Sequence, residues 1–484
     1  MDPRKLPPVM QALAGLSAFI LIASLATLVL RGGGGAGKAS AAKPTPTASA
    51  SAPVAPTASA PAPPLAVAAR PKILHGLSRA AVSPGDIATA IAGPMGVPVL
   101  GSGVSAEVVD VVTGQPLFSR GATTQVPPAS AAKLVTAAAA LLVLGPNAVL
   151  TTLVTPGAAA HQVVLVGGGD PTLAGAAADP AGTYPVAASL AGLAKATAKA
   201  LVAAGQKSIS LAYDNTLYAG PTSAEGWKPS YLSAGNVAPV GSLEVDEGRR
   251  TDKTVLSRVT DPAQSAAAEF AGLLRSDGIT VAGVVSPGVP AAGAKSIAKV
   301  TSAPISAQVE RMLRLSDNDL AESLARQVAL KKHQPATFAG SALAVAQAVA
   351  PLGIDATSLH MVDGSGLSTS DTMEASVLTT VVRAAASSAH PELRALLAGL
   401  PVAGFLGTLS TRYGTTATAA GVGVVRAKTG TLTNVSSLAG VLVDADGRQL
   451  AFAVIAAHVP STSPLDAEAA LDRIAATLAT CGCH

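Results

Sequence analysis

The sequence has little cysteine, few aromatic residues and few charges. Two cysteines occur among 484 residues, Cys481 and Cys483 in the terminal CGCH. They supply no disulfide framework and no zinc-like spacing, although outside the cytoplasm they can oxidise with each other or with another chain. Aromatic residues make up 2% and charged residues 13% of the chain, and the basic residues are scattered, which argues against nucleic-acid binding. We expect no metal, no other cofactor and no nucleic acid as partner.

One long apolar run stands near the N-terminus. Residues 9–30, VMQALAGLSAFILIASLATLVL, carry no charge and would cross about 30 Å of hydrocarbon as a helix. Arg4 and Lys5 precede the run and favour a cytoplasmic N-terminus. Its length exceeds the roughly 7–15 apolar residues of a signal peptide, but ASA at 39–41 offers a cleavage site. The sequence predicts a cytoplasmic tip and transmembrane anchor at 1–31, hence a single-pass membrane protein, or one secreted to the cell wall if the segment is cleaved.

The rest of the chain divides by composition. Residues 32–72 are rich in proline, alanine, serine and threonine, which predicts a disordered linker. Hairpin patterns then occur at 106–120 and at 436–457, the second with Asp-Gly at its turn. They predict one antiparallel sheet with strands from both ends of the chain, covered by helices, within an α/β (α+β) protein. Short strands between Gly/Pro turns at 152–300 indicate an inserted α/β region.

The spacing Ser-x-x-Lys, which can place a hydroxyl beside a lysine base, occurs three times. Ser40–Lys43 lies in the linker, which cannot hold two groups together. Ser296–Lys299 lies in a strand-like stretch, where side chains three apart point to opposite faces. Ser130–Lys133 follows Pro127-Pro128 at the first turn of an apolar helix, where both side chains share a face and free N–H groups favour an anion. Ser130 is therefore the candidate nucleophile.

Two further motifs follow in order. SDN at 316–318 is the only Ser-x-Asn in a chain with five asparagines, and KTG at 428–430 is also single. Alone, SDN could cap a helix and KTG could form a turn. Together, SAAK at a helix start, SDN in a loop of a helical region and KTG on a strand resemble the penicillin-recognising acyl-serine transferases.

Other stretches narrow the resemblance. They are GGGDPTL (167–173), AYDNTLYAGPTSAEGW (212–227), SLEVDEGR (242–249) and DGSGLS (363–368). Over residues 73–479 the chain is similar to the D-alanyl-D-alanine carboxypeptidase/endopeptidase family of low-molecular-mass class C penicillin-binding proteins, the S13 peptidases. The resemblance implies a penicillin-binding/β-lactamase-like transpeptidase fold, with the catalytic domain at 73–151 and 301–484 and the inserted domain or domains at 152–300. The family carries large extra domains here, and 182 residues separate Lys133 from Ser316.

The residues also indicate how the nucleophile is activated. No GxSxG motif occurs and no His/Asp pair stands near Ser130, so Lys133 is the expected base. A free lysine has a pKa near ~10.4, and its neutral form lies about 4–5 kcal/mol uphill at pH 7. Burial and a second cation, for which Lys428 is the candidate, would lower that pKa.

The resemblance implies roles for the other motif residues. Ser316 relays a proton towards the leaving amine, and Asn318 orients Lys133 and the substrate amide. The substrate-binding residues are Lys428, Thr429, Gly430 and Thr431. Lys428 and Thr429 bind the terminal carboxylate of a D-Ala-D-Ala stem peptide of peptidoglycan, and the N–H groups of Ser130 and Thr431 form an oxyanion hole. β-Lactams mimic this substrate and acylate Ser130.

Five residues outside the three motifs are expected to have structural roles. Asp363 and Ser365 are expected in a turn beside the cleft, Glu322 and Arg326 as a pair on one helix, and His458 in the core.

Two other functions share these motifs. A serine β-lactamase would need a deacylating glutamate, and no ExxLN follows the SDN motif. A catalytically silent peptidoglycan-binding module would not need the full set of nucleophile, base and recognition residues. The expected function is therefore a serine D-alanyl-D-alanine carboxypeptidase or endopeptidase. The sequence leaves open which of these two activities prevails, the role of the insertion and the oligomeric state.

Overall fold

The computed structural model describes residues 84–178, 184–250 and 256–482. The expected anchor and linker, residues 1–72, lie outside this range, and so does the pair Ser40–Lys43. Among the helices in the described segments, none has both the length and the apolar character to cross a membrane.

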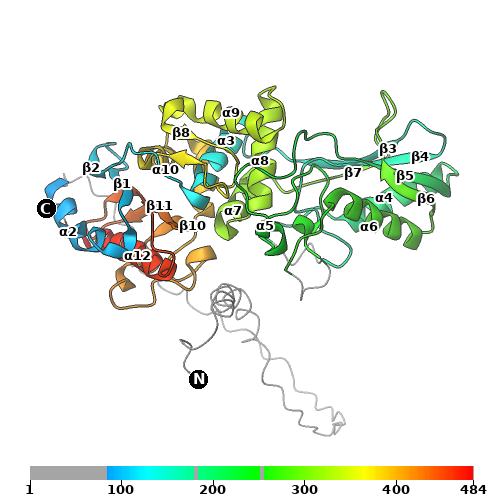
Figure 1. The fold of residues 1–484 in the computed structure, drawn as a ribbon. Coiled ribbons are helices and arrows are strands. Elements are labelled where there is room, and N and C mark those ends of the chain that lie inside the picture. Colours follow the sequence, from blue (N-terminus) through cyan, green and yellow to red (C-terminus); the bar gives the residue numbers. More distant parts are fainter. Residues whose placement is uncertain (1–83, 179–183, 251–255, 483–484) are drawn as a thin grey trace, which may run out of the picture. The chain divides into compact units, whose positions relative to one another are not determined.

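A five-stranded antiparallel sheet contains strands from both ends of the chain (Figure 1). The strand order is β10-β11-β12-β1-β2, with bounds β1 Gly103–Asp110, β2 Pro116–Arg120, β10 Arg426–Leu432, β11 Val435–Val443 and β12 Gln449–Ala457. The two hairpins join where β1 pairs with β12, in a register that sets Val108 opposite Phe452. The predicted fold class, an antiparallel sheet covered by helices, is confirmed.

Helices cover both faces of this sheet. Leu438 and Phe452 belong to an apolar cluster with α2 (Pro84–Met95) and α12 (Pro464–Thr480). The neighbouring residues Ala439 and Ala453 belong to a different cluster, which packs against α10 (Ala375–Ala386) and the helices beyond it. Because side chains alternate along a strand, β11 and β12 bury both faces and read as nearly continuous apolar runs.

Helix α3 (Lys133–Leu144) is the centre of the helical layer. It contacts α7, α8 and α9, and Ala137–Ala140 along it are fully buried. These small side chains let neighbouring helices approach closely. The other helices of this layer are α7 Ile305–Leu315, α8 Asn318–Lys331, α9 Phe338–Val349 and α11 Arg394–Gly399.

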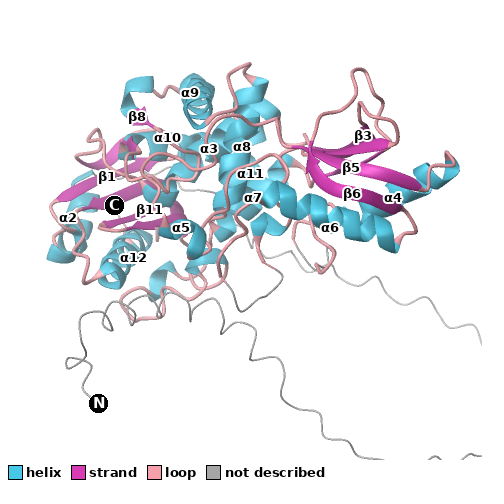
Figure 2. Ribbon diagram, turned by 45° about the vertical axis from the view of Figure 1, so that its right-hand side comes forward, coloured by secondary structure: helices cyan, strands magenta, loops and turns pink. Residues whose placement is uncertain are grey.

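A second five-stranded sheet occupies the stretch expected as an insertion and extends one residue beyond it at each end, to Thr151 and Thr301 (Figure 2). Its order is β6-β5-β4-β3-β7, with β3 Thr151–Pro156, β4 Gln162–Val166, β5 Ser208–Asp214, β6 Thr280–Pro287 and β7 Ala298–Thr301. Strands β4, β5 and β6 are parallel, and β3 is antiparallel to both of its neighbours. Helices α4 (Leu190–Ala203) and α6 (Pro262–Ser276) share one apolar cluster with this sheet. The bounds 152–300 stay a prediction.

Short elements complete the described fold. They are α5 Ser230–Ser233, β8 Leu359–His360, β9 Thr372–Met373 and the 3-10 helices Pro98–Leu100, Ala129–Ala132, Asp246–Gly248, Ala350–Leu352, Ala356–Ser358, Pro391–Leu393, Gly407–Leu409 and Ala419–Gly421.

Two predictions concern residues near the C-terminus, His458 and the cysteines. His458 was expected in the core but is exposed, because β12 ends at Ala457 and the chain turns there with a φ of +64° at His458. Cys481 follows the last helix, and Cys483 lies outside the described residues.

Candidate active site

The turn that carries Ser130 leads directly into helix α3. Ala129–Ala132 form one 3-10 turn, and the α-helix continues from Lys133. Ala129 is fully buried with a φ of +50°, a left-handed conformation that costs an alanine about 1–3 kcal/mol and persists only where its surroundings enforce it. The predicted helix start is thus present, with a strained residue immediately before the candidate nucleophile.

The amine of Lys133 contacts three oxygens. Nζ lies 3.0 Å from Ser130 Oγ, 2.6 Å from Asn318 Oδ1 and 2.6 Å from the carbonyl oxygen of Ser365. A charged amine donates three hydrogen bonds, so all three donors have acceptors. Of the two Ser-x-x-Lys pairs within the described segments, this one brings its side chains together. In the other, Lys299 lies on β7 and Ser296 stands just before the strand.

Burial tunes the charge of Lys133. The side chain is fully buried, and the loss of solvation lowers its pKa to about 8. The carboxylates of Asp363 and Glu322 act in the opposite direction and raise that pKa. The neutral amine therefore lies about 1.4 kcal/mol uphill at pH 7, so deprotonation is accessible near neutrality.

The SDN motif connects two helices. Ser316 ends α7 in a left-handed conformation with a φ of +57°. Asp317 begins α8, where its carboxylate accepts a hydrogen bond from the N–H of Leu320. The motif therefore caps a helix and also presents Ser316 and Asn318 to the site. SDN is both a helix cap and a part of the candidate active site.

Lys428 is the second buried amine of the site. Its Nζ lies 2.9 Å from Ser316 Oγ and 2.7 Å from the carbonyl oxygen of Thr429. Burial, and then the charge of Lys133, lower the pKa of Lys428 well below its ordinary value. The expected effect of burial on Lys133 is present, but the expected effect of the second cation runs the other way: the charge of Lys133 lowers the pKa of Lys428.

Strand β10 carries the KTG motif as predicted, next to the turn of Ser130. A side chain at Gly430 would place its Cβ 2.8 Å from the carbonyl oxygen of Pro128 and 3.0 Å from the backbone nitrogen of Ser130. The glycine is required because the two backbones approach this closely. The hydroxyl of Thr429 lies 2.8 Å from that of Thr408.

Thr431 is held by the last helix of the chain. Its hydroxyl donates to Glu468 Oε1 of α12 at 2.8 Å. The structure therefore brings the predicted residues of all three motifs to one place, while the side chain of Thr431 has a partner of its own.

The DGSGLS loop contacts the site through the carbonyl oxygen of Ser365. Asp363 accepts hydrogen bonds from the N–H groups of Ser365, Gly366 and Ser368. Trp227, from the predicted insertion, donates its indole N–H to the same carboxylate at 2.7 Å. The loop is the structural turn that was expected, and it additionally supplies the carbonyl oxygen that Lys133 contacts.

The expected pairing of Glu322 with Arg326 is not the main contact of either residue. Glu322 accepts from the N–H of Gly364 in the DGSGLS loop, and burial raises its pKa to about 8. Arg326 donates to the carbonyl oxygens of Ala219 and Ala336 and lies over the ring of Phe338. Both side chains thus connect α8 to neighbouring loops.

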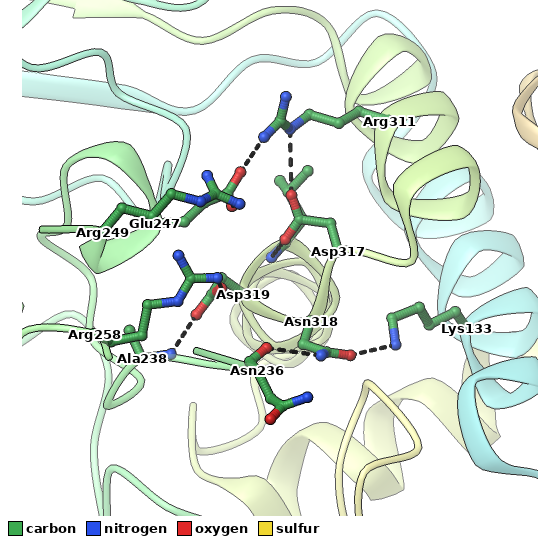
Figure 3. Close-up of polar contacts among 11 residues, drawn as sticks. Lys133, Asn236, Ala238, Glu247, Arg249, Arg258, Arg311, Asp317, Asn318 and Asp319 are labelled. Carbon is green, nitrogen blue, oxygen red and sulfur yellow. Dashed lines mark hydrogen bonds and ion pairs between the residues drawn. The ribbon is translucent and has the colours of Figure 1, made fainter. Parts of the chain in front are cut away.

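Three buried carboxylates, one of them the aspartate of the SDN motif, lie close enough to hold a cation. Oxygens of Glu247, Asp317 and Asp319 lie within 4.8 Å of one another. Arginines surround them (Figure 3): Arg311 contacts Glu247 and Asp317, Arg249 contacts Glu247, and Arg258 lies 3.6 Å from Asp319. This cluster is an ion-pair network in which guanidinium groups supply the positive charge.

Sequence and structure comparisons agree with this geometry. The sequence model of the D-Ala-D-Ala carboxypeptidase 3 (S13) family matches residues 88–255 and 249–478. The chain belongs to this family. The resemblance predicted from the motifs is confirmed.

Relatives of the S13 chain include carboxypeptidases of mycobacteria. It is 39% identical to Carboxypeptidase DacB of Mycolicibacterium smegmatis over 82% of this chain and 84% of that protein. It is 35% identical to Carboxypeptidase Rv3627c of Mycobacterium tuberculosis over 78% and 81%. Its fold matches the crystal structure of penicillin binding protein 4 from Haemophilus influenzae, with a TM-score of 0.64 and 23% identity over 81% of this chain and 98% of that one.

Sequence reasoning about this S13 chain missed the contacts made by the backbone and by the insertion. The carbonyl oxygen of Ser365 contacts Lys133, the carbonyl oxygen of Asn236 contacts Asn318, and the indole of Trp227 contacts Asp363 in the DGSGLS loop. A carbonyl oxygen has no residue type, so no motif could reveal it. Trp227 does carry a signal, as the only tryptophan of the chain.

Proposed function

We propose that this protein is a serine D-alanyl-D-alanine carboxypeptidase that cleaves peptidoglycan stem peptides through an acyl-enzyme on Ser130. The observation that carries the proposal is the 3.0 Å contact between Lys133 Nζ and Ser130 Oγ, with Lys133 held at the same time by Asn318 and Ser365. A serine hydroxyl needs a base within hydrogen-bond reach, and this amine provides one.

The first step uses the neutral form of Lys133. The neutral amine keeps its hydrogen bonds to Asn318 and Ser365, and its lone pair accepts the proton of Ser130. The Ser130 oxygen then attacks the carbonyl carbon of the D-Ala-D-Ala bond. The oxyanion that forms is stabilised by the N–H groups of Ser130 and Thr431.

The second step releases the leaving amine. Ser316 accepts a hydrogen bond from Lys428, and its own hydroxyl proton can pass to the amine of the departing D-alanine. Lys133 passes the proton that it took from Ser130 on to Ser316, which restores the Ser316 hydroxyl and the neutral amine of Lys133. The acyl-enzyme bond to Ser130 remains until a water molecule, deprotonated by Lys133, hydrolyses it. The proton taken from Ser130 thus leaves with the amine, and the proton of the water returns to Ser130.

Recognition of the substrate is assigned to strand β10. Lys428 and Thr429 are proposed to bind the terminal carboxylate, and Gly430 lets the strand lie against the nucleophile turn. A carboxylate that arrives beside Lys428 would favour its charged form, because an opposite charge stabilises it. β-Lactams, which carry a carboxylate beside a strained amide, would enter the same way and acylate Ser130.

We also propose that residues 9–30 anchor the protein in the cell membrane, with the catalytic part outside the cytoplasm. The uncharged run and the preceding Arg4 and Lys5 support this placement. Peptidoglycan is assembled on that side, so the substrate and the site would share a compartment.

Incubation of the purified protein with two substrates tests the activity. A stem pentapeptide should release D-alanine, and Ser130→Ala should release none. The rates on the pentapeptide and on a D-Ala–diaminopimelate crosslink separate carboxypeptidase from endopeptidase activity. Absence of hydrolysis of both substrates by the wild-type protein would overturn the proposal.

A further inference from the structure

A loop of the predicted insertion contacts the N-terminus of helix α8, where the SDN motif lies. The carbonyl oxygen of Asn236 accepts a hydrogen bond from Asn318 Nδ2 at 2.8 Å. Two residues later, the N–H of Ala238 donates to Asp319 Oδ1 at 2.7 Å. Figure 3 shows these two contacts side by side, with Lys133 on the opposite side of Asn318. The loop therefore contacts two adjacent residues of α8 through its own backbone.

The contact with Asn236 determines which way the amide of Asn318 faces. A carbonyl oxygen only accepts hydrogen bonds, so it must face the NH₂ group of the amide. The amide oxygen is then directed at Lys133 Nζ, 2.6 Å away. If the amide turned over, its NH₂ group would face the donating amine of Lys133 and its oxygen would face the carbonyl of Asn236.

We propose that Asp319 is a positioning residue for catalysis, which anchors the backbone of Ala238 so that the neighbouring carbonyl of Asn236 holds the amide of Asn318 towards Lys133. The proposal rests on the proposed function, because it assumes that Asn318 and Lys133 act in acylation. It assigns the insertion a part in the catalytic machinery, since Asn236 and Ala238 lie between strands β5 and β6 of the second sheet.

The surroundings of Asp319 explain why an acid stands there. Its carboxylate is buried, and one oxygen accepts from Ala238 while the other lies 3.6 Å from the equally buried Arg258. A hydrogen bond to an ionised acceptor is about twice as strong as a neutral one. On the other side of Asn318, Asp317 pairs with Arg311, which also contacts Glu247 of the insertion. Both neighbours of Asn318 thus connect to the insertion, Asp319 directly and Asp317 through Arg311.

The test compares acylation by a fluorescent penicillin, per folded molecule, at pH 8. Asp319→Ala removes the acceptor, and acylation should fall on the order of 10²-fold, the usual cost of a misplacement near 1 Å. Asp319→Asn keeps an oxygen that accepts from Ala238 and should stay within about threefold of the wild type. Asp319→Ser is too short to reach Ala238 and should behave as Asp319→Ala; it serves if the alanine variant does not fold.

A double-mutant cycle separates positioning from general destabilisation. If Asp319 acts through Asn318, adding Asp319→Ala to Asn318→Ala should cost no further acylation. Asp110→Ala, which breaks the buried pair of Asp110 with Arg448 away from the site, should lower the melting temperature and leave acylation of the folded fraction unchanged.

Three results would overturn the proposal: acylation of Asp319→Ala at the wild-type rate, equal losses in Asp319→Asn and Asp319→Ala, or additive losses in the cycle. Failure of the proposed function would look different. In that case the wild-type protein itself would not be acylated.

Discussion

Asn318 Oδ1 lies 2.6 Å from Lys133 Nζ, although the two residues are 185 positions apart in the chain. The contact joins the first turn of α3 to the first turn of α8. Because the same amine also reaches Ser130 and Ser365, the charge of Lys133 and the orientation of Asn318 are linked. The first two predictions follow from this link.

Acylation should depend on the ionisation of Lys133. Burial lowers the pKa of this group from 10.5 to about 8, and only the neutral form is a base. The acylation rate should therefore rise about tenfold per pH unit below pH 8 and level off above it. Stopped-flow measurement with a chromogenic β-lactam over pH 6–10 checks this, and a flat profile across that range would count against Lys133 as the base.

Asn318→Asp should move that profile. The new carboxylate would lie beside Nζ, and an opposite charge at such a distance raises the pKa of an amine by about 1–3 units. The rising limb should shift to higher pH, so acylation at pH 7 falls at least about tenfold while the plateau is recovered at alkaline pH. Asn318→Ala is the control, because it removes the contact without adding charge. If the rising limb of the pH profile does not shift in Asn318→Asp, the contact between residue 318 and Lys133 Nζ is contradicted.

Gly430→Ala should disable acylation without unfolding the protein. The added methyl group would meet the carbonyl oxygen of Pro128 and the nitrogen of Ser130, so either strand β10 or the nucleophile turn must move. A shift of that kind is expected to cost about 10²-fold in rate, measured as the acylation rate constant.

The matched control is a glycine with free space around it. Gly272 lies inside α6 with no atom within 4 Å of an added Cβ, and Gly272→Ala should raise the unfolding free energy by about 0.5–1 kcal/mol with acylation unchanged. If Gly430→Ala is acylated as fast as Gly272→Ala, the close approach of β10 to Ser130 is not required for acylation.

Trp227→Phe should loosen the DGSGLS loop. The variant keeps an aromatic ring against Phe338, whose ring centroid lies 5.5 Å away, but removes the N–H that donates to Asp363. Loss of a hydrogen bond to a charged group costs about 1.5–3 kcal/mol, and we expect the unfolding free energy, followed by circular dichroism, to fall near the lower end. Acylation should also fall, because Ser365 belongs to that loop.

Tyr231→Phe is the comparison for this prediction. Its hydroxyl donates to the carbonyl oxygen of Leu367 in the same loop, at 3.3 Å, which is a longer and uncharged contact. The variant should lose less than about 1 kcal/mol. A larger loss from Tyr231→Phe than from Trp227→Phe would show that Asp363 does not depend on the indole.

The parts of the site that follow from local patterns could be predicted from the sequence. Pro127-Pro128 before an apolar run placed Ser130 at a helix start, and the strand pattern of the C-terminal part placed KTG on a strand. The order of the three motifs then indicated one site. In each case the information lies within a few residues of the motif.

Other parts depend on contacts between distant segments and could not be read from a pattern. The sequence argument named burial and Lys428 as the causes of a lowered pKa of Lys133. Burial is the cause that the structure bears out, and its extent depends on the whole helical layer. The carbonyl oxygens of Ser365 and Asn236 are backbone atoms, which any residue type provides. His458 was misplaced because the last strand ends one residue earlier.

Labelling with a fluorescent penicillin, followed by mass spectrometry of the labelled peptide, tests the central claim most directly. The account predicts one stable acyl group per chain on Ser130, and no label on Ser130→Ala. A wild-type protein that takes up no label would contradict the acyl-enzyme mechanism, and so would a label that persists in Ser130→Ala. Rapid loss of the label with turnover of the penicillin would instead indicate a β-lactamase.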